Sequence, residues 1–273
     1  MILNNRTLSS ALLLSLAAHA FGAAPQERRA ERVRWIMGTL CEIDAPGAPD
    51  PAVGAAFAEI ERWDRILSLY KKESEASALN RAAGAGPMKV SADFYAAVEE
   101  ALRMAKETGG AFDPTVTRAG WTKVRLDPKA RTVELPAGVG LDFGGIGKGW
   151  ALDKAAAVLK EAGVSRAMFN FGGQILALGE WTAMVPGRAE PLTLKDASVS
   201  VSGDSEHPGH IKNPVDGKAV RRPGSAAAAL PSASEADAWS TALFVLGKTP
   251  PSFRGLSFFD PGIPAVTSKG GRS

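Results

Sequence analysis

The hydrophobic positions of this chain follow two periods, one typical of helices and one typical of strands. Apolar side chains recur every three or four residues along several segments, which is the spacing of one helix face. These segments are predicted to be helices at 51–70, 91–107, 150–161 and 234–246. Short apolar runs predict strands at 132–135, 167–171, 197–202 and 256–259, and a strand over 32–44 that is interrupted at Met37-Gly38-Thr39. The segment 221–234, rich in Ala, Pro and Ser, is expected to be a loop or an edge strand.

This order of elements decides the fold class. Helices and strands neither alternate strictly nor separate into two blocks, so an α+β fold is expected rather than a doubly wound sheet. A chain of 273 residues with 45% hydrophobic residues can bury one sizeable core or two small ones. Its single cysteine excludes an internal disulfide scaffold, and Cys41 is expected to be a buried small side chain. No internal repeat is present.

The charges are almost balanced. There are 32 basic and 29 acidic residues, which gives a net charge of +3. No basic block stands out along the chain, so a nucleic-acid partner is not expected.

The N-terminus has the layout of a secretory signal peptide. Arg6 is followed by an apolar run at 11–18 and by the small residues Ala18-His19-Ala20. The run is shorter than the ~20 apolar residues that span a bilayer. We therefore expect residues 1–20 to be removed, with the cut at 20 or a few residues later. Residues 21–273 would form one exported, periplasmic domain without a transmembrane segment. The alternative is that this segment remains as an uncleaved anchor. No cysteine lies near the cut, so a lipid-modified N-terminus is not expected.

A glycine-rich segment, Asp142-Phe143-Gly144-Gly145-Ile146-Gly147-Lys148-Gly149-Trp150, lies before a predicted helix. It does not match the dinucleotide pattern G-x-G-x-x-G, because Trp150 stands where the third glycine belongs. It does not match the P-loop either, because Gly149 follows Lys148 instead of Ser or Thr. Glycines before a helix can still direct backbone N–H groups at an anion. The alternative is a tight turn with solvated charges on Asp142 and Lys148.

Histidine is scarce. One of the 3 histidines, His19, lies in the predicted signal peptide, so an imidazole base must be His207 or His210. A zinc site is not expected, because the sequence after residue 20 offers neither a third histidine nor a second cysteine as a ligand. The G-x-S-x-G elbow of many hydrolases is also absent. A solvated loop histidine is the simpler interpretation of either position.

Asp237 and Thr241 are four residues apart on a predicted helix, so they share one face. A carboxylate and a hydroxyl together suit Mg²⁺, which takes few protein ligands and completes its shell with water and phosphate oxygens. The alternative is a capping pair, with Ser234 at the N-cap and Asp237 at the third helical position.

Taken together, short segments along nearly all of the chain after residue 20 resemble the FAD:protein FMN transferase family, formerly labelled thiamine-biosynthesis lipoproteins. The segments that carry the resemblance are Met37-Gly38-Thr39, Tyr70 with Ser74-Glu75 and Leu79-Asn80-Arg81, Gly110 to Val116, Asp142 to Gly149, Asn170-Phe171-Gly172-Gly173, Ser202-Gly203-Asp204, His210-Ile211 with Pro214, and Asp237 to Gly247. The resemblance implies a single compact α+β domain, in which antiparallel sheets pack with helices and FAD lies in a cleft.

The resemblance also implies roles for individual residues. His210 would be the catalytic base, and Mg²⁺ would be held by a backbone oxygen of Gly145 and the side chains of Asp237 and Thr241, with Ser240 a weaker candidate. The implied FAD contacts are Met37, Tyr70, Ala111, Phe112, Asp113, Asp142, Lys148 and Lys212.

The implied reaction is transfer of FMN from FAD to a Thr or Ser hydroxyl of an extracytoplasmic target flavoprotein, with release of AMP. A periplasmic FAD-binding or carrier protein, and a pyrophosphatase that splits FAD into FMN and AMP, are the alternatives. One departure from the family stands out. Asn213 replaces the acid of the usual H-I-x-D-P-x-T-G and would lose a group that could orient this loop.

Overall fold

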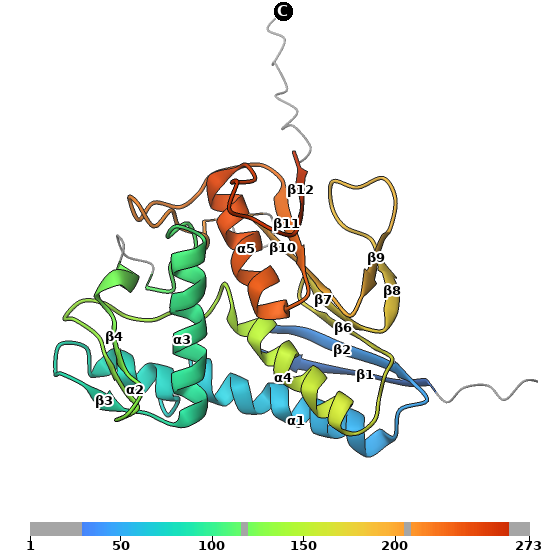
Figure 1. Ribbon diagram of the computed structural model, residues 1–273, viewed down its shortest axis with the longest axis horizontal. Coiled ribbons are helices and arrows are strands. Elements are labelled where there is room, and N and C mark those ends of the chain that lie inside the picture. Colours follow the sequence, from blue (N-terminus) through green and yellow to red (C-terminus); the bar gives the residue numbers. More distant parts are fainter. Residues whose placement is uncertain (1–28, 116–119, 205–208, 262–273) are drawn as a thin grey trace, which may run out of the picture.

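The computed structural model describes residues 29–115, 120–204 and 209–261 (Figure 1). The predicted signal peptide and His207 lie outside the described residues. Among the helices of the described ranges, none combines the length and apolarity needed to cross a membrane.

An antiparallel sheet organises the chain. Its seven strands run in the order β1 (Arg29–Ile36), β2 (Thr39–Pro46), β6 (Ala167–Phe171), β7 (Gln174–Leu178), β10 (Ser198–Gly203), β11 (Ser225–Leu230) and β12 (Leu256–Asp260). Each neighbouring pair is antiparallel. The predicted α+β class is therefore confirmed. The interruption at Met37-Gly38 is the turn of the β1–β2 hairpin, where both residues have positive φ.

Helices lie along one face of this sheet (Figure 1). The elements on that face are α1 (Asp50–Leu67), α4 (Gly147–Glu161) and α5 (Ala233–Leu246), where α5 packs on β10 and β11 and α4 packs between α1 and α5. Beside them lie α2 (Glu75–Arg81), α3 (Ala92–Glu107), a short 3-10 helix at Gly120–Lys123, and a small sheet of β3 (Met88–Lys89), β5 (Thr132–Glu134) and β4 (Arg125–Asp127). The hairpin of β8 (Glu180–Ala183) and β9 (Leu192–Lys195) covers part of the opposite face.

The large core lies between the sheet and the helices. Fully buried Trp63, Phe57, Phe169 and Trp239 fill it. Trp63 meets Trp150 of α4 edge to face, with ring centroids 5.5 Å apart, an arrangement that adds to the gain from burying both rings. This packing holds the first turn of α4, which belongs to the glycine-rich segment, against α1.

The predicted helices are confirmed, with shifted ends. Helix α1 ends at Leu67, three residues before Tyr70, and α4 begins at Gly147, inside the glycine-rich segment. The expectation of a loop or edge strand at 221–234 is wrong for 225–230, because β11 pairs with both β10 and β12. Its alanines are buried alternately against the helices and against the β8–β9 hairpin. A strand buried on both faces shows no polar alternation, which is why the pattern failed there.

Candidate active site

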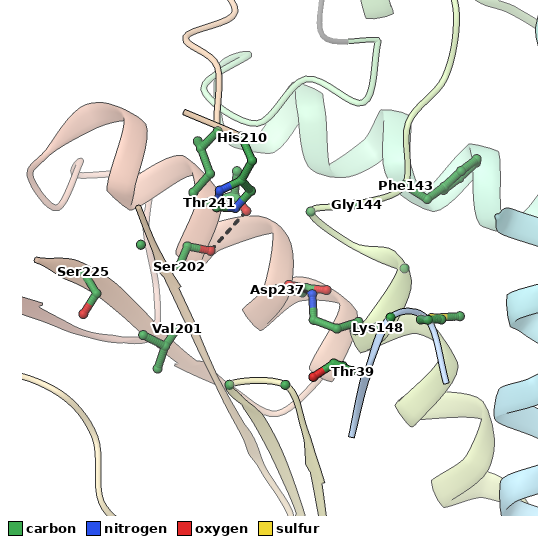
Figure 2. Close-up of a pocket in the computed structure, with 18 of the residues that line it drawn as sticks. Thr39, Phe143, Gly144, Lys148, Val201, Ser202, His210, Ser225, Asp237 and Thr241 are labelled. Atoms are coloured by element: carbon green, nitrogen blue, oxygen red, sulfur yellow. Dashed lines mark hydrogen bonds and ion pairs between the residues drawn. The ribbon is translucent and has the colours of Figure 1, made fainter. Parts of the chain in front are cut away.

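A cleft of about 1850 Å³ opens beside the first turn of α4 (Figure 2). Apart from Ser240, the weaker metal candidate, every residue that the sequence predicted for the site lines it, although these residues are spread from position 37 to position 241. They are Met37, Tyr70, Ala111, Phe112, Asp113, Asp142, Gly145, Lys148, His210, Lys212, Asp237 and Thr241. The volume exceeds the ~300–1,000 Å³ of an ordinary small-molecule pocket, so the cleft has room for a ligand of dinucleotide size.

The glycine-rich segment forms one wall. The Asp142 N–H donates to Pro114 O at 2.6 Å, which ties this segment to the turn at Ala111–Asp113. Asp142 Oδ1 in turn accepts from Gly144 N at 2.8 Å. Helix α4 starts without a side-chain cap, but Gly147 N donates to Phe143 O at 2.6 Å and Gly149 N donates to Asp237 Oδ2. Of its first three N–H groups, that of Lys148 is therefore the one available to an anion in the cleft.

Asp237 is almost fully buried at the base of this wall, 3% exposed. Its Oδ2 accepts from Gly149 N at 3.1 Å, and Lys148 Nζ lies 3.8 Å from its Oδ1. Ser200 Oγ also donates to Oδ1, at 3.4 Å. The capping alternative is wrong, because the cap of α5 is Ser232, whose Oγ accepts from Glu235 N.

Thr241 follows Asp237 by one helical turn and reaches the glycine-rich segment. A Cβ added at Gly145 would lie 3.0 Å from Thr241 Oγ1, so the two residues are in contact. Ser202 Oγ lies 3.3 Å from the same hydroxyl (Figure 2). The Thr241 hydroxyl and the Gly145 backbone thus meet in the cleft that Asp237, one helical turn before Thr241, also lines. Hard oxygen donors of this kind fit Mg²⁺.

Ser240 is not placed with them. It is fully buried, and its hydroxyl lies within hydrogen-bond distance of Asp237 O at 2.9 Å and of Ser200 Oγ at 3.1 Å. Within the described ranges, no group of three or more His, Cys, Asp and Glu side chains is arranged to hold a metal ion.

His210 begins a short hairpin on another side of the cleft. The Val220 N–H donates to Ile211 O and the Asn213 N–H to Lys218 O, both at 2.8 Å. Ile211 is 7% exposed and joins the core, which anchors the hairpin. Figure 2 shows His210 on the same side of the cleft as Thr241 and Ser202.

Two side chains hold the backbone around His210. Asp204 accepts a hydrogen bond from Gly209 N, the residue before the histidine. Asn213 Oδ1 accepts from Val215 N at 2.9 Å. The amide oxygen thus makes a turn-stabilising contact of the kind that an acid would make, and the replacement at Asn213 does not leave the loop without an orienting group.

The predicted FAD contacts differ in exposure. Tyr70 is fully exposed at the cleft rim, where its ring can stack on a ligand, whereas Phe112 is buried against Gly145. Asp113 is also buried, and its Oδ1 accepts from Thr115 N and Thr115 Oγ1. Burial raises the pKa of the Asp113 carboxyl, while the hydrogen bonds from Thr115 oppose that rise.

Sequence reasoning missed Ser200, which contacts both Asp237 and Ser240. A signal was available, because the alternation Val199-Ser200-Val201-Ser202 places both serines on one face of β10. That this face meets α5 is a property of the packing, which no local pattern contains.

Named proteins and solved structures are similar to this chain. A protein called FAD:protein FMN transferase from Treponema pallidum (strain Nichols) is 29% identical, over 83% of this chain and 81% of that protein. One of the same name from Klebsiella pneumoniae (strain 342) is 26% identical, over 78% and 81%. The solved ApbE protein of Thermotoga maritima has a TM-score of 0.73 at 24% identity, over 81% of this chain and 87% of that one. The flavin transferase ApbE of Vibrio cholerae has a TM-score of 0.71 at 23% identity, with the same coverage.

The two solved structures show that the fold is shared. The sequence model of the ApbE family matches residues 37–119 and 116–252, which is most of the described chain. With the fold and the cleft as described above, this match leads to one conclusion: the chain belongs to the ApbE family.

Proposed function

We propose that this protein is an FAD:protein FMN transferase, which moves FMN from FAD to a Thr or Ser hydroxyl of a target flavoprotein and releases AMP. The observation that carries the proposal is the convergence on one cleft of a histidine, buried oxygen donors and an uncapped helix N-terminus. Relatives that bear this name, among them one that is 29% identical over 83% of the chain, support it.

The chain's own groups divide the chemistry between them. The backbone N–H of Lys148, in the first turn of α4, and the Lys148 ammonium would bind the FAD pyrophosphate. His210 would accept the proton of the target hydroxyl as its oxygen bonds to the FMN-side phosphorus and the bond to the AMP oxygen breaks. General-base catalysis of this kind contributes ~10²–10⁴-fold in rate. Tyr70, on the rim, would stack on a ring of the FAD.

We propose Asp237, Thr241 and a backbone oxygen of Gly145 as the holders of Mg²⁺. The support is the contact between Gly145 and Thr241 and the buried position of Asp237 on the same helix face. Bound there, Mg²⁺ would supply electrostatic stabilisation of the charge on the phosphoryl oxygens.

We further propose that the protein is exported to the periplasm, without lipidation, after removal of residues 1–20 or a few more. The support is the sequence of the N-terminus alone. N-terminal sequencing of the protein recovered from a periplasmic fraction tests this. A protein that stays in the cytoplasmic fraction with Met1 intact would contradict it.

Formation of AMP separates the proposed function from its alternatives. The protein is incubated with FAD and Mg²⁺, with and without an acceptor protein, and AMP is measured. AMP that requires the acceptor supports the transferase. AMP formed equally without an acceptor indicates a pyrophosphatase, and bound FAD that never yields AMP indicates a carrier.

A further inference from the structure

The hairpin that begins at His210 has two different faces. Ile211 hydrogen-bonds to Val220, Lys212 forms a bridge with Ala219, and Asn213 hydrogen-bonds to Lys218. Side chains alternate between the two faces of such a ladder. Ile211 and Val220 pack on the core, although Ile211 also borders the cleft. The other face carries His210 and Lys212, which line the cleft.

The same register brings together basic side chains on the cleft face. His210 and Lys212 lie on it, two residues apart, and continuing the register by one pair places Arg221 opposite His210. Directly opposed residues of an antiparallel pair have Cβ atoms ~4.5–5.5 Å apart. All three residues line the cleft. In addition, a Cβ added at Gly209 would lie 3.9 Å from Arg221 Nη2, so the guanidinium lies beside the residue before His210.

Within the part of the chain that the structure describes, no protein group matches the charge of Arg221 or of Lys212, whereas other cations of the cleft are held by protein groups. Lys71 Nζ lies 2.5 Å from Asp64 Oδ2, and Lys148 pairs with Asp237. Arg222 Nη1 donates to Phe244 O at 2.7 Å. Arg221 is exposed and has neither a hydrogen bond nor an ion pair among the residues that the structure describes. A guanidinium that is free to use its donors favours phosphate, which it can bind in a bidentate manner.

We infer that Arg221 binds the pyrophosphate of FAD from the hairpin side of the cleft, next to His210. The inference rests on the proposed function only in naming FAD as the ligand. The guanidinium of Arg221 would donate to phosphoryl oxygens near His210, the proposed general base. There it would stabilise the negative charge on these oxygens while the phosphorus–oxygen bond to AMP breaks.

Binding measurements test this directly, with matched substitutions on one hairpin. FAD affinity is measured by quenching of flavin fluorescence for the wild type, Arg221→Met, Arg221→Lys and the control Lys218→Met. Lys218 lies on the same hairpin and is exposed, but it does not line the cleft. We expect Arg221→Met to weaken FAD binding about tenfold or more, Arg221→Lys to restore part of it, and Lys218→Met to leave it unchanged.

Competition with inorganic pyrophosphate identifies the part of FAD that Arg221 reaches. We expect pyrophosphate to displace FAD from the wild type and from Lys218→Met, and to compete about tenfold less well in Arg221→Met. FAD binding by Arg221→Met equal to that of the wild type would overturn the inference. Weaker FAD binding with unchanged competition by pyrophosphate would overturn it as well, because Arg221 would then contact the flavin or the adenosine.

Thermal unfolding completes the test. If Arg221→Met melts at the same temperature as the wild type, its loss of FAD affinity is due to the missing guanidinium. If Arg221→Met and Lys218→Met both melt at a lower temperature, the loss of affinity reflects a damaged hairpin, and the inference is overturned. The outcome stays separate from that of the proposed function. A wild type that binds FAD but never forms AMP would refute transfer and leave these affinities to report on Arg221.

Discussion

The Gly149 N–H donates to Asp237 Oδ2 at 3.1 Å and joins two helices whose residues are 88 positions apart in the chain. The glycine is necessary for this approach, because a Cβ there would lie 2.1 Å from Ala233 O. The first turn of α4 can therefore rest against the start of α5, which brings the glycine-rich segment to Asp237.

Gly149→Ala should lower the free energy of unfolding by about 3 kcal/mol, because the added methyl group forces two backbones apart. Urea unfolding followed by circular dichroism measures this. The control is Gly54→Ala in α1, where the nearest atom to an added Cβ is Arg32 Nη1 at 3.8 Å. That change should stabilise the protein by about 0.5–1 kcal/mol through helix propensity. Equal effects of the two substitutions would contradict the proposed close approach.

Asp237→Asn should raise the Mg²⁺ concentration needed for half-maximal AMP formation by about tenfold or more, because a carboxylate ligand becomes a neutral amide. A titration of activity with Mg²⁺ measures it. Glu235→Gln is the control, since Glu235 lies on the same helix but pairs with Arg103 outside the cleft. An unaltered Mg²⁺ dependence in Asp237→Asn would remove Asp237 from the metal site.

His210→Ala should reduce FMN transfer by ~10²–10⁴-fold and leave FAD affinity near that of the wild type, since the base acts on the target hydroxyl. Single-turnover transfer and equilibrium FAD binding measure the two quantities. His207→Ala, the other histidine of 21–273, should transfer at the normal rate. If instead His207→Ala is inactive and His210→Ala active, the assignment of the base is reversed.

Glu59 gives a prediction about stability and pH. The hydrogen bond from Arg62 is the main reason that the pKa of Glu59 is lowered, and the Trp63 N–H contributes, while burial opposes both. A carboxyl with a lowered folded-state pKa stabilises the protein above its unfolded pKa of about 4.3, and this stability is lost as the pH falls through the folded value.

Glu59→Gln should therefore lower the free energy of unfolding by about 1 kcal/mol at pH 7, because the Arg62 side chain is partly exposed and its pairing is screened by water. The difference from the wild type should shrink as the pH falls below 4. Urea unfolding at pH 7 and pH 3 measures it. Glu73→Gln, an exposed position with no hydrogen bond or ion pair in the described part of the chain, should show no such pH-dependent difference.

The sequence predicted those elements whose pattern reflects burial on one face. Helix α1 buries one stripe that includes Val53, Phe57 and Ile60, and its prediction was correct to within a few residues. Strand β11 is buried on both faces with alanines, so neither period is visible in it. The hydrophobic pattern of a segment cannot predict such a strand, because its small side chains pack against neighbouring elements on both faces of the sheet.

In the site, too, some features could be predicted from the sequence and others depend on tertiary packing. Asp237 and Thr241 could be predicted because helical spacing alone puts them on one face. The contacts of Ser200 with Asp237, and of Gly145 with Thr241, depend on how β10 and the glycine-rich segment pack on α5. The place inferred for Arg221, opposite His210, depends on the register of a hairpin. That register is set by its turn, where the Gly217 N–H, at positive φ, donates to Asn213 O.

The central claim is transfer of FMN to a protein hydroxyl, and the mass of the acceptor tests it most directly. The purified protein is incubated with FAD, Mg²⁺ and an acceptor flavoprotein, and the intact acceptor mass and the AMP formed are measured with and without EDTA. The account predicts one FMN added to the acceptor for each AMP released, with both abolished by EDTA. AMP released while the acceptor mass stays unchanged would contradict it.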